Sequence, residues 1–259
     1  MPESTDAVVV KRRADAPPTF FAWEAAGLDW LRVAGGVDIV EVRDVGARHI
    51  TLDRVDEHSA TGAAAEQFGR DLALTHSAGA VAFGVGPPGW TGDGFIGRQP
   101  LALQTFSIWG EFYADTRLLP YARAAQLVGN LDARGVRLIE RVCTRLVNGD
   151  FDDDRPPARI HGDLWAGNVL YAGDGRGVRA VLIDPAAHGG HGLTDLAMLA
   201  LFGTQHLSRV QSAYAEAAGL PADWRELIGL HQLHPLLVHA VSHSAGYGRQ
   251  ACDVASRYA

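Results

Sequence analysis

The sequence has 259 residues and a formal net charge of −7, and hydrophobic residues make up 47% of it. This length and composition provide for one large domain or a two-lobed unit with an ample core, and they exclude a mainly disordered chain. The acidic balance excludes a general basic surface for nucleic acid or for anionic membranes. We therefore expect a small-molecule partner, with no nucleic acid and no membrane.

The chain contains two cysteines, Cys143 and Cys252. They exclude a disulfide framework and a CxxC metal pair, as is typical of a reducing compartment. Near the amino terminus a short apolar run precedes the basic residues, which is the reverse of a secretory signal, and no apolar stretch is long enough to span a bilayer. We therefore expect a soluble, cytoplasmic protein.

The first part of the chain predicts a small sheet with one helix. Residues 7–10 are mostly β-branched and predict a strand, and apolar residues recur at near-helical spacing over residues 20–32. Residues 39–45 and 49–55 alternate in polarity and predict two further strands, with Gly46 between them.

The middle of the chain predicts helices around a long loop. Residues 63–76 have a helical pattern, whereas residues 79–100 are crowded with glycine and proline and predict a loop. Residues 101–148 then predict two helices with Pro120 near their junction. Because long loops in compact proteins are often functional, the loop is a candidate part of a site.

The last part predicts three short strands followed by helices. The strands are expected at residues 159–160, 169–171 and 178–183, and almost everything from residue 193 to the end has a helical pattern. The chain has no internal repeat. The fold class predicted for it is α+β.

Two histidine pairs near the carboxyl end have helical spacing, His231 with His234 and His239 with His243. Such spacing can bind zinc, but no carboxylate or thiolate lies between them. We therefore expect structural or solvent-facing histidines there.

One segment carries most of the chemical information, IHGDLWAGNVLY at residues 160–171, and it is followed by Asp184 in VLIDPAAHGG. Phosphoryl transfer needs a carboxylate that orients the attacking hydroxyl and accepts its proton, and Mg²⁺ that bridges the phosphate oxygens. Asp163, Asn168 and Asp184 meet these demands. The alternative, an Asx-rich turn between strands, stays open but is disfavoured by the ordered HGDxxxxN with a strand-borne IDP.

The interval of five residues between Asp163 and Asn168 matches the catalytic loop of protein kinases, in which an Asp precedes a metal-binding Asn by the same interval. Asp184 would supply the second metal ligand. Oxygen ligands without imidazole or thiolate suit Mg²⁺ better than zinc. The motif predicts a kinase that uses ATP and Mg²⁺, with Asp163 activating the substrate hydroxyl.

Three segments resemble the fructosamine kinase (ketosamine-3-kinase) family, of the aminoglycoside-phosphotransferase and protein-kinase-like group. They are HGDLWAGN at residues 161–168, DPAAHGGHGLTDLAMLALFG at 184–203 and GFIGRQPLALQTFSIWGEFYADTRLLP at 94–120. The resemblance covers nearly all of the chain. It implies a protein-kinase-like two-lobed fold, with a reduced N-terminal sheet lobe over residues 1–58 and a mostly helical catalytic lobe over residues 59–259.

The same resemblance implies roles for residues of the catalytic loop and its surroundings. Asp163 would be the catalytic base, Asn168 and Asp184 would hold Mg²⁺, and His161 and Asp195 would support the catalytic loop.

The resemblance also implies a nucleotide site and an acceptor site. Lys11 would contact the α and β phosphates of ATP and pair with Glu24 on the following helix. Trp165, His191 and Trp109 are candidates for substrate contact. For Trp109 the alternative is an aromatic core position, because aromatic residues at three-residue spacing are often core.

Two departures from the family pattern leave the activity open. Only ten residues precede Lys11, too few for the two strands and glycine-rich loop that cover the phosphates in kinases. A truncated reading frame, a reduced lobe, cover from a partner chain and lost catalysis would each explain this. The family's aromatic pair and Glu near its GH motif are replaced by His188, Gly189 and Leu193, so another acceptor alcohol is plausible.

The leading prediction is transfer of the ATP γ-phosphate to a sugar hydroxyl of a fructosamine-like ketosamine. The alternatives are an aminoglycoside or other amino-alcohol phosphotransferase, and a non-catalytic nucleotide-binding pseudokinase. The oligomeric state and the identity of the acceptor are open.

Overall fold

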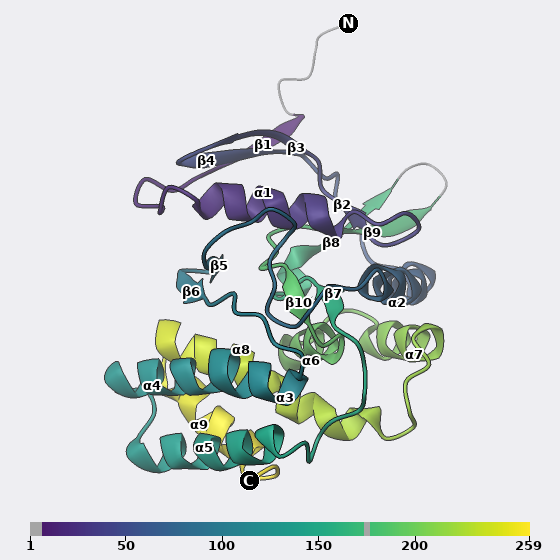
Figure 1. Cartoon of the computed structure of the whole chain (residues 1–259). Helices are drawn as coiled ribbons and strands as arrows, with labels where there is room; N and C mark the ends of the chain where they lie inside the picture. The colour runs from purple at the N-terminus through teal and green to yellow at the C-terminus, as the bar shows by residue number, and fades with distance from the viewer. Residues whose placement is uncertain (1–6, 174–176) are drawn as a thin grey trace, which may run out of the picture.

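The computed structural model describes residues 7–173 and 177–259. Figure 1 shows a small sheet with a helix beneath it at the amino-terminal end, and a group of helices at the opposite end. Short sheets lie between these two parts. The predicted α+β class is confirmed.

The first sheet contains β1 (Val8–Arg12), β4 (His49–Asp53) and β3 (Val42–Gly46) in the order β1-β4-β3. All its pairings are antiparallel, and Lys11 lies opposite Ile50. The sheet packs over α1 (Phe20–Leu31) (Figure 1). This pairing sets Lys11 on the strand beside the helix that carries Glu24.

A second sheet has the order β2-β9-β8, with β2 (Asp38–Ile39) parallel to β9 (Val178–Leu182) and β8 (Val169–Gly173) antiparallel to it. The single strand predicted over residues 39–45 is therefore wrong, because the segment forms β2 and β3 in two different sheets. The Val40 N–H still donates to the carbonyl of Leu182, after which the chain turns to pair with β4.

Two short pairs of strands complete the sheets. β7 (Ala158–Ile160) pairs with β10 (His188–Gly190), and β5 (Gly94–Ile96) pairs with β6 (Gln99–Leu101). The long loop predicted over residues 79–100 thus ends in a hairpin. No local pattern predicts β10, because His-Gly-Gly has little β propensity and forms a strand only against β7.

The helix α2 (Gly62–Ser77) packs along α7 (Leu207–Ala217), as Figure 1 shows. The hydroxyl of Thr61 accepts a hydrogen bond from the Ala64 N–H and caps the start of α2. Gly69 of α2 faces the backbone of α7. The contact of these two helices is therefore backbone against backbone.

The remaining helices form the lower part of the molecule in Figure 1. They are α3 (Trp109–Phe112), a π-helix (Tyr113–Leu118), α4 (Leu119–Leu127), α5 (Ala133–Val147), α6 (Leu193–Phe202), α8 (Ile228–Ser242) and α9 (Ala245–Ala255). The first three run on from one another, so residues 101–148 contain two helical stretches as predicted. Pro120 lies at the start of α4 inside the first stretch, however, and not near the junction, which falls between Leu127 and Ala133. Within the described ranges, no helix is both long and apolar enough to cross a membrane.

The buried apolar residues form two clusters, and α1 contributes to both. Trp23 belongs to the cluster around α3, α4, α5, α8 and α9, whereas Leu28 and Leu31 belong to the cluster around the sheets, α2 and α6. This shared helix ties the two halves of the molecule together. The predicted division of the chain between residues 58 and 59 stays a prediction.

We expect Gly69→Ala to lower the free energy of unfolding by about 2–3 kcal/mol, because overpacking a close backbone contact forces the helices apart. A Cβ there would lie 2.3 Å from the carbonyl oxygen of Val210 and 2.9 Å from the amide nitrogen of Tyr214. Urea unfolding followed by circular dichroism measures the change. The matched control is Gly246→Ala in α9, where the nearest atom lies at 3.4 Å. Equal effects of the two substitutions would contradict the close packing of α2 and α7.

Candidate functional site

The loop between β7 and β8 carries Asp163 and depends on a glycine. Gly162 has φ +80°, and a Cβ there would lie 2.4 Å from the carbonyl oxygen of Ala186. A side chain at this position would be strained and would also collide with the segment after Asp184. Gly162 therefore lets the loop that carries Asp163 lie directly against the segment that carries Asp184.

The buried carboxylate of Asp195, at the start of α6, binds the backbone of this loop through hydrogen bonds. Its Oδ2 accepts from the His161 N–H at 2.7 Å, and its Oδ1 accepts from the Gly162 N–H at 2.9 Å. The Nε2 of His76, from α2, lies 3.0 Å from Oδ2. Burial alone would raise the pKa of Asp195, but the hydrogen bond and charge of His76 outweigh it and hold the pKa below its usual value.

His76 was not predicted as part of the site. It is the last residue of the predicted helical pattern, in the last turn of α2, and only the packing of α2 in the fold brings it to Asp195. Its Nδ1 lies 2.7 Å from the hydroxyl of Tyr214, so both ring nitrogens have partners. No local sequence signal could have identified it.

The ring of His161 joins the loop to the end of β9. Its Nε2 donates to the carbonyl of Ile183 at 2.9 Å, and its Nδ1 accepts from the Asp163 N–H at 3.3 Å. Burial lowers the pKa of His161, which keeps the ring neutral with one donor and one acceptor nitrogen. His161 thereby orients the backbone of Asp163.

The side chain of Asn168 bridges the two motif segments. Its Nδ2 donates to the backbone carbonyl of Asp163 at 2.8 Å and to that of Asp184 at 3.4 Å. These two contacts use the donor end of the amide, so the Oδ1 end is left for another ligand.

Lys11 of β1 lies between two carboxylates. Its Nζ is 2.6 Å from Oε1 of Glu24 on α1 and 2.5 Å from Oδ1 of Asp184. Burial alone would lower the pKa of Lys11, but the two negative charges outweigh it and raise the pKa, so the ammonium stays charged. The backbone of Asp184 has φ +56°, an uncommon conformation for a residue other than glycine and one that occurs at functional sites.

These side chains surround one cavity of about 290 Å³. Lys11, Glu24, Asp163, Asn168 and Asp184 all line it, together with Trp165. Burial raises the pKa of Asp163 to about 7, and the charges of Asp184 and Asp195 act in the same direction. A carboxylate with such a pKa can take up a proton at neutral pH, which is the property that a general base needs.

A larger hollow of about 890 Å³ adjoins this cavity, and the two share Asp163, Trp165 and Gly97. Its other walls come from the β5–β6 turn and from α6, α8 and the start of α9. The indole of Trp165 is 43% exposed. The arrangement can hold two small molecules, one on each side of Asp163.

Trp109 and His191, predicted as substrate contacts, line neither of these two spaces. The Trp109 ring is buried and stacks on the ring of His231 with 4.6 Å between ring centroids. The centroid of the His191 ring lies 4.7 Å from that of His231. The Nε2 of His191 contacts the carboxylate of Asp153 at 3.1 Å. The structure thus places both residues in the core, which for Trp109 was the alternative interpretation.

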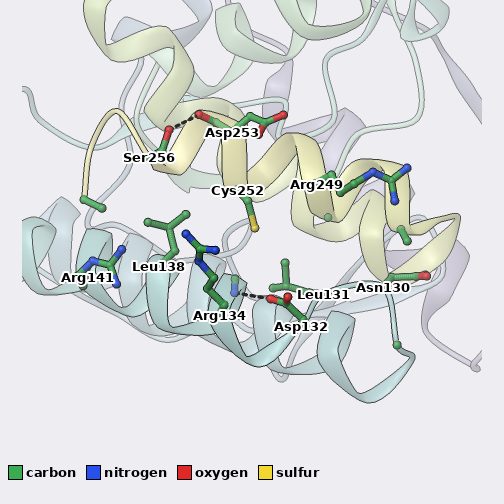
Figure 2. A pocket seen from close by; sticks show the side chains of 15 residues that line it. Asn130, Leu131, Asp132, Arg134, Leu138, Arg141, Arg249, Cys252, Asp253 and Ser256 are labelled. Atoms are coloured by element: carbon green, nitrogen blue, oxygen red, sulfur yellow. Dashed lines mark hydrogen bonds between the residues drawn. The ribbon is translucent and has the colours of Figure 1, made fainter.

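Another hollow, of about 830 Å³, lies between α5 and α9. Figure 2 shows Arg134 pointing from α5 into it, with Cys252 on the facing helix. Arg141, Arg249 and Asp253 also line it. None of the residues predicted for catalysis or binding does, so this hollow is separate from the site around Asp163.

The family model of fructosamine kinase matches residues 1–258. The chain belongs to the fructosamine kinase family. It is 30% identical to the "Probable ketoamine kinase" of Thermus thermophilus, over 92% of this chain and 82% of that one. It is 32% identical to the "Probable ketoamine kinase" of Synechocystis sp., over 71% of this chain but only 59% of that relative's length.

The comparison with solved structures identifies the fold. The "putative fructosamine-3-kinase" of Thermobifida fusca has a TM-score of 0.86 and 47% identity, covering 96% of this chain and 84% of that one. The aminoglycoside phosphotransferase APH(4)-Ia has a TM-score of 0.60 at 17% identity, covering 97% and 85%, and therefore shows the fold alone. The predicted family and protein-kinase-like fold are confirmed.

We expect Asp195→Asn to lower the free energy of unfolding by about 2–4 kcal/mol at pH 7, because either orientation of the amide sets its NH₂ against a backbone N–H. The pKa of Asp195 is lowered in the folded protein, so its contribution is complete above the unfolded pKa and is lost as the pH falls through the folded one. Urea unfolding at several pH values should therefore show that the difference in the free energy of unfolding between the wild type and Asp195→Asn narrows below about pH 4. The exposed helical acid Asp29, changed to Asn, is the control. A difference that persisted unchanged in acid would contradict the assignment.

Proposed function

We propose that this chain transfers the γ-phosphate of ATP to a sugar hydroxyl of a ketoamine, with Asp163 as the catalytic base. The observation that carries the proposal is the convergence of Lys11, Asp163, Asn168 and Asp184 on one cavity. A cation for phosphate oxygens, a proton acceptor and two oxygen ligands are the groups that phosphoryl transfer requires.

Asp163 accepts the proton of the acceptor hydroxyl as that oxygen attacks phosphorus. Its position at the boundary of the cavity and the larger hollow lets it reach a molecule on either side. Lys11 binds the phosphates of ATP, and Glu24 holds the ammonium in place. His161 and Asp195 keep the loop in the conformation that points Asp163 at the acceptor.

The donor set fits Mg²⁺. Asn168 retains its Oδ1, and Asp184 has a second carboxylate oxygen besides the one that contacts Lys11. Over the described residues there is no cluster of three or more His, Cys, Asp or Glu able to hold a metal. Mg²⁺ takes one or two protein oxygens and completes its shell with phosphate and water, and Asn168 and Asp184 would supply such oxygens. When bound, it would neutralise charge on the phosphate oxygens.

The names of the relatives support the proposed acceptor class. Two are named ketoamine kinases, and a 28% identical protein of Arabidopsis thaliana is named protein-ribulosamine 3-kinase. The complete set of cationic, carboxylate and amide groups favours catalysis over nucleotide binding alone. A cytoplasmic location, expected from the free cysteines, and the lobe boundary after residue 58 belong to the same proposal.

We expect Asp163→Asn to lower kcat for phosphorylation of a ketosyl amine by about 1000-fold, since the amide keeps the shape but cannot accept the proton. Coupled measurement of ADP release gives the rate, and calorimetry of a non-hydrolysable ATP analogue shows whether nucleotide binding persists. The control is Asp56→Asn, whose side chain is 96% exposed. Undiminished turnover in Asp163→Asn would refute the proposed role.

We expect kcat/KM for the acceptor to rise with pH through an ionisation at or somewhat below pH 7. The pKa of Asp163 is raised to about 7, so the carboxyl is protonated and inactive below that value and becomes a base above it. Bound Mg²⁺ is a positive charge that shifts the ionisation downward. The residual activity of Asp163→Asn should lack this acidic limb. A profile for the wild type that is flat from pH 5 to pH 8 would contradict the assignment.

A further inference from the structure

Few charged residues line the larger hollow beyond Asp163, and they carry opposite charges at different places. Among the described residues that line it, Asp163 is the one carboxylate and Arg98 is the one guanidinium. Gln99 and Ser242 contribute uncharged polar groups. The acid lies at the catalytic end, so the rest of the hollow offers no carboxylate to an incoming ammonium group.

The floor and one wall of the hollow are apolar or aromatic. Met198 and Phe202 of α6 form part of the floor, and His239, His243 and Tyr247 form a wall. The rings of His239 and His243 are stacked, with 5.0 Å between centroids and 16° between planes. Burial lowers the pKa of His239, so this ring adds no positive charge at neutral pH. Such a wall packs against the carbon face of a small ligand.

Arg98 lies at the turn between β5 and β6, and over residues 7–173 and 177–259 it has no hydrogen bond or ion pair. The positive charge of Arg98 acts weakly on Asp15, but Asp15 forms its ion pair with Arg13, whose Nε lies 3.2 Å from the Oδ1 of Asp15. The neighbouring Gln99 donates to the hydroxyl of Ser242 at 3.3 Å and so ties the turn to the end of α8. The backbone that carries the guanidinium is thereby anchored while the guanidinium is unpaired.

We propose that Arg98 recognises a carboxylate on the acceptor, so that the enzyme acts on ketoamines of free amino acids in preference to those of amines. This rests on the proposed function and names the acceptor class at the same site. The reacting hydroxyl lies at the Asp163 end, the carbon skeleton packs on the aromatic wall, and the carboxylate of the amino acid pairs with the guanidinium fork. An acceptor with a second ammonium group meets an uncompensated positive charge there instead. The hollow, at about 890 Å³, has the size of a small-molecule site.

The test compares three acceptors that differ in charge at one position. They are the ketosyl derivatives of glycine, glycinamide and ethylenediamine, which carry a carboxylate, a neutral amide and an ammonium beyond the same secondary amine. Each is prepared in a ribulosyl and a fructosyl series. Because Arg98 is exposed, we expect kcat/KM of the wild type to favour the carboxylate over the amide by about fivefold, and the ammonium to be the poorest acceptor.

Two variants assign the preference to the guanidinium. Arg98→Gln should bring the carboxylate-to-amide ratio of kcat/KM to about one, and Arg98→Glu should reverse the order of the three acceptors. The control is Arg134→Gln, an exposed arginine in the separate hollow of Figure 2, which should keep the wild-type ratio.

The possible results distinguish a failure of this inference from a failure of the proposed function on which it rests. Phosphorylation of none of the acceptors would overturn the proposed function and the inference with it. Phosphorylation of all three with equal kcat/KM by the wild type would overturn the inference alone. If Arg98→Gln kept the preference for the carboxylate acceptor, Arg98 would not recognise the acceptor. The same conclusion would follow if Arg98→Gln raised KM for ATP by an equal factor with all three acceptors.

Discussion

The ion contact of Lys11 with Glu24 and Asp184 is the constraint on which the site depends. It joins a strand and a helix near the start of the chain to Asp184, which lies 173 positions after Lys11. All three side chains are at least partly shielded, and Lys11 is the shared partner of both carboxylates, so its removal would leave Glu24 and Asp184 without their counter-charge. The contact therefore fixes the first sheet and α1 over the larger half of the molecule, and the cavity lies between them.

Three carboxylates lie close together around the loop that carries Asp163, and each has different partners. Asp195 receives two backbone N–H groups and His76, which stabilise its ionised form. Asp184 has Lys11 as its partner. Burial raises the pKa of Asp163 to about 7, the charges of Asp184 and Asp195 act in the same direction, and only a hydrogen bond with Asn168 opposes them. Burial and like charges at Asp163, and the hydrogen bonds that Asp195 accepts, thus move the pKa values of these two carboxyls in opposite directions.

Asp163 and Trp165 lie at the junction of two spaces, one beside Lys11 and one beneath the β5–β6 turn. This geometry separates the requirements of the two proposed substrates. The smaller space is lined by ionic groups that suit phosphate and metal, whereas the larger one is mainly apolar and aromatic with a single guanidinium. Variation of the turn and of α8 and α9 would change the acceptor without disturbing the residues around Lys11.

The sequence alone was sufficient for the family and the fold class. HGDxxxxN and IDP are local patterns whose spacing matches a loop and a strand end, and they predicted Asp163, Asn168 and Asp184 at the smaller cavity, whereas Lys11 and Glu24 were predicted from the resemblance to the family. It was not sufficient for β10, for the two strands within residues 39–45, or for His76 beside Asp195. Nor did it show that Trp109 and His191 stack in the core. Each of these depends on a partner distant in the chain, and hydrophobic period and local propensity carry no information about which distant segment supplies a hydrogen bond or a packing surface. Tertiary structure alone decided them.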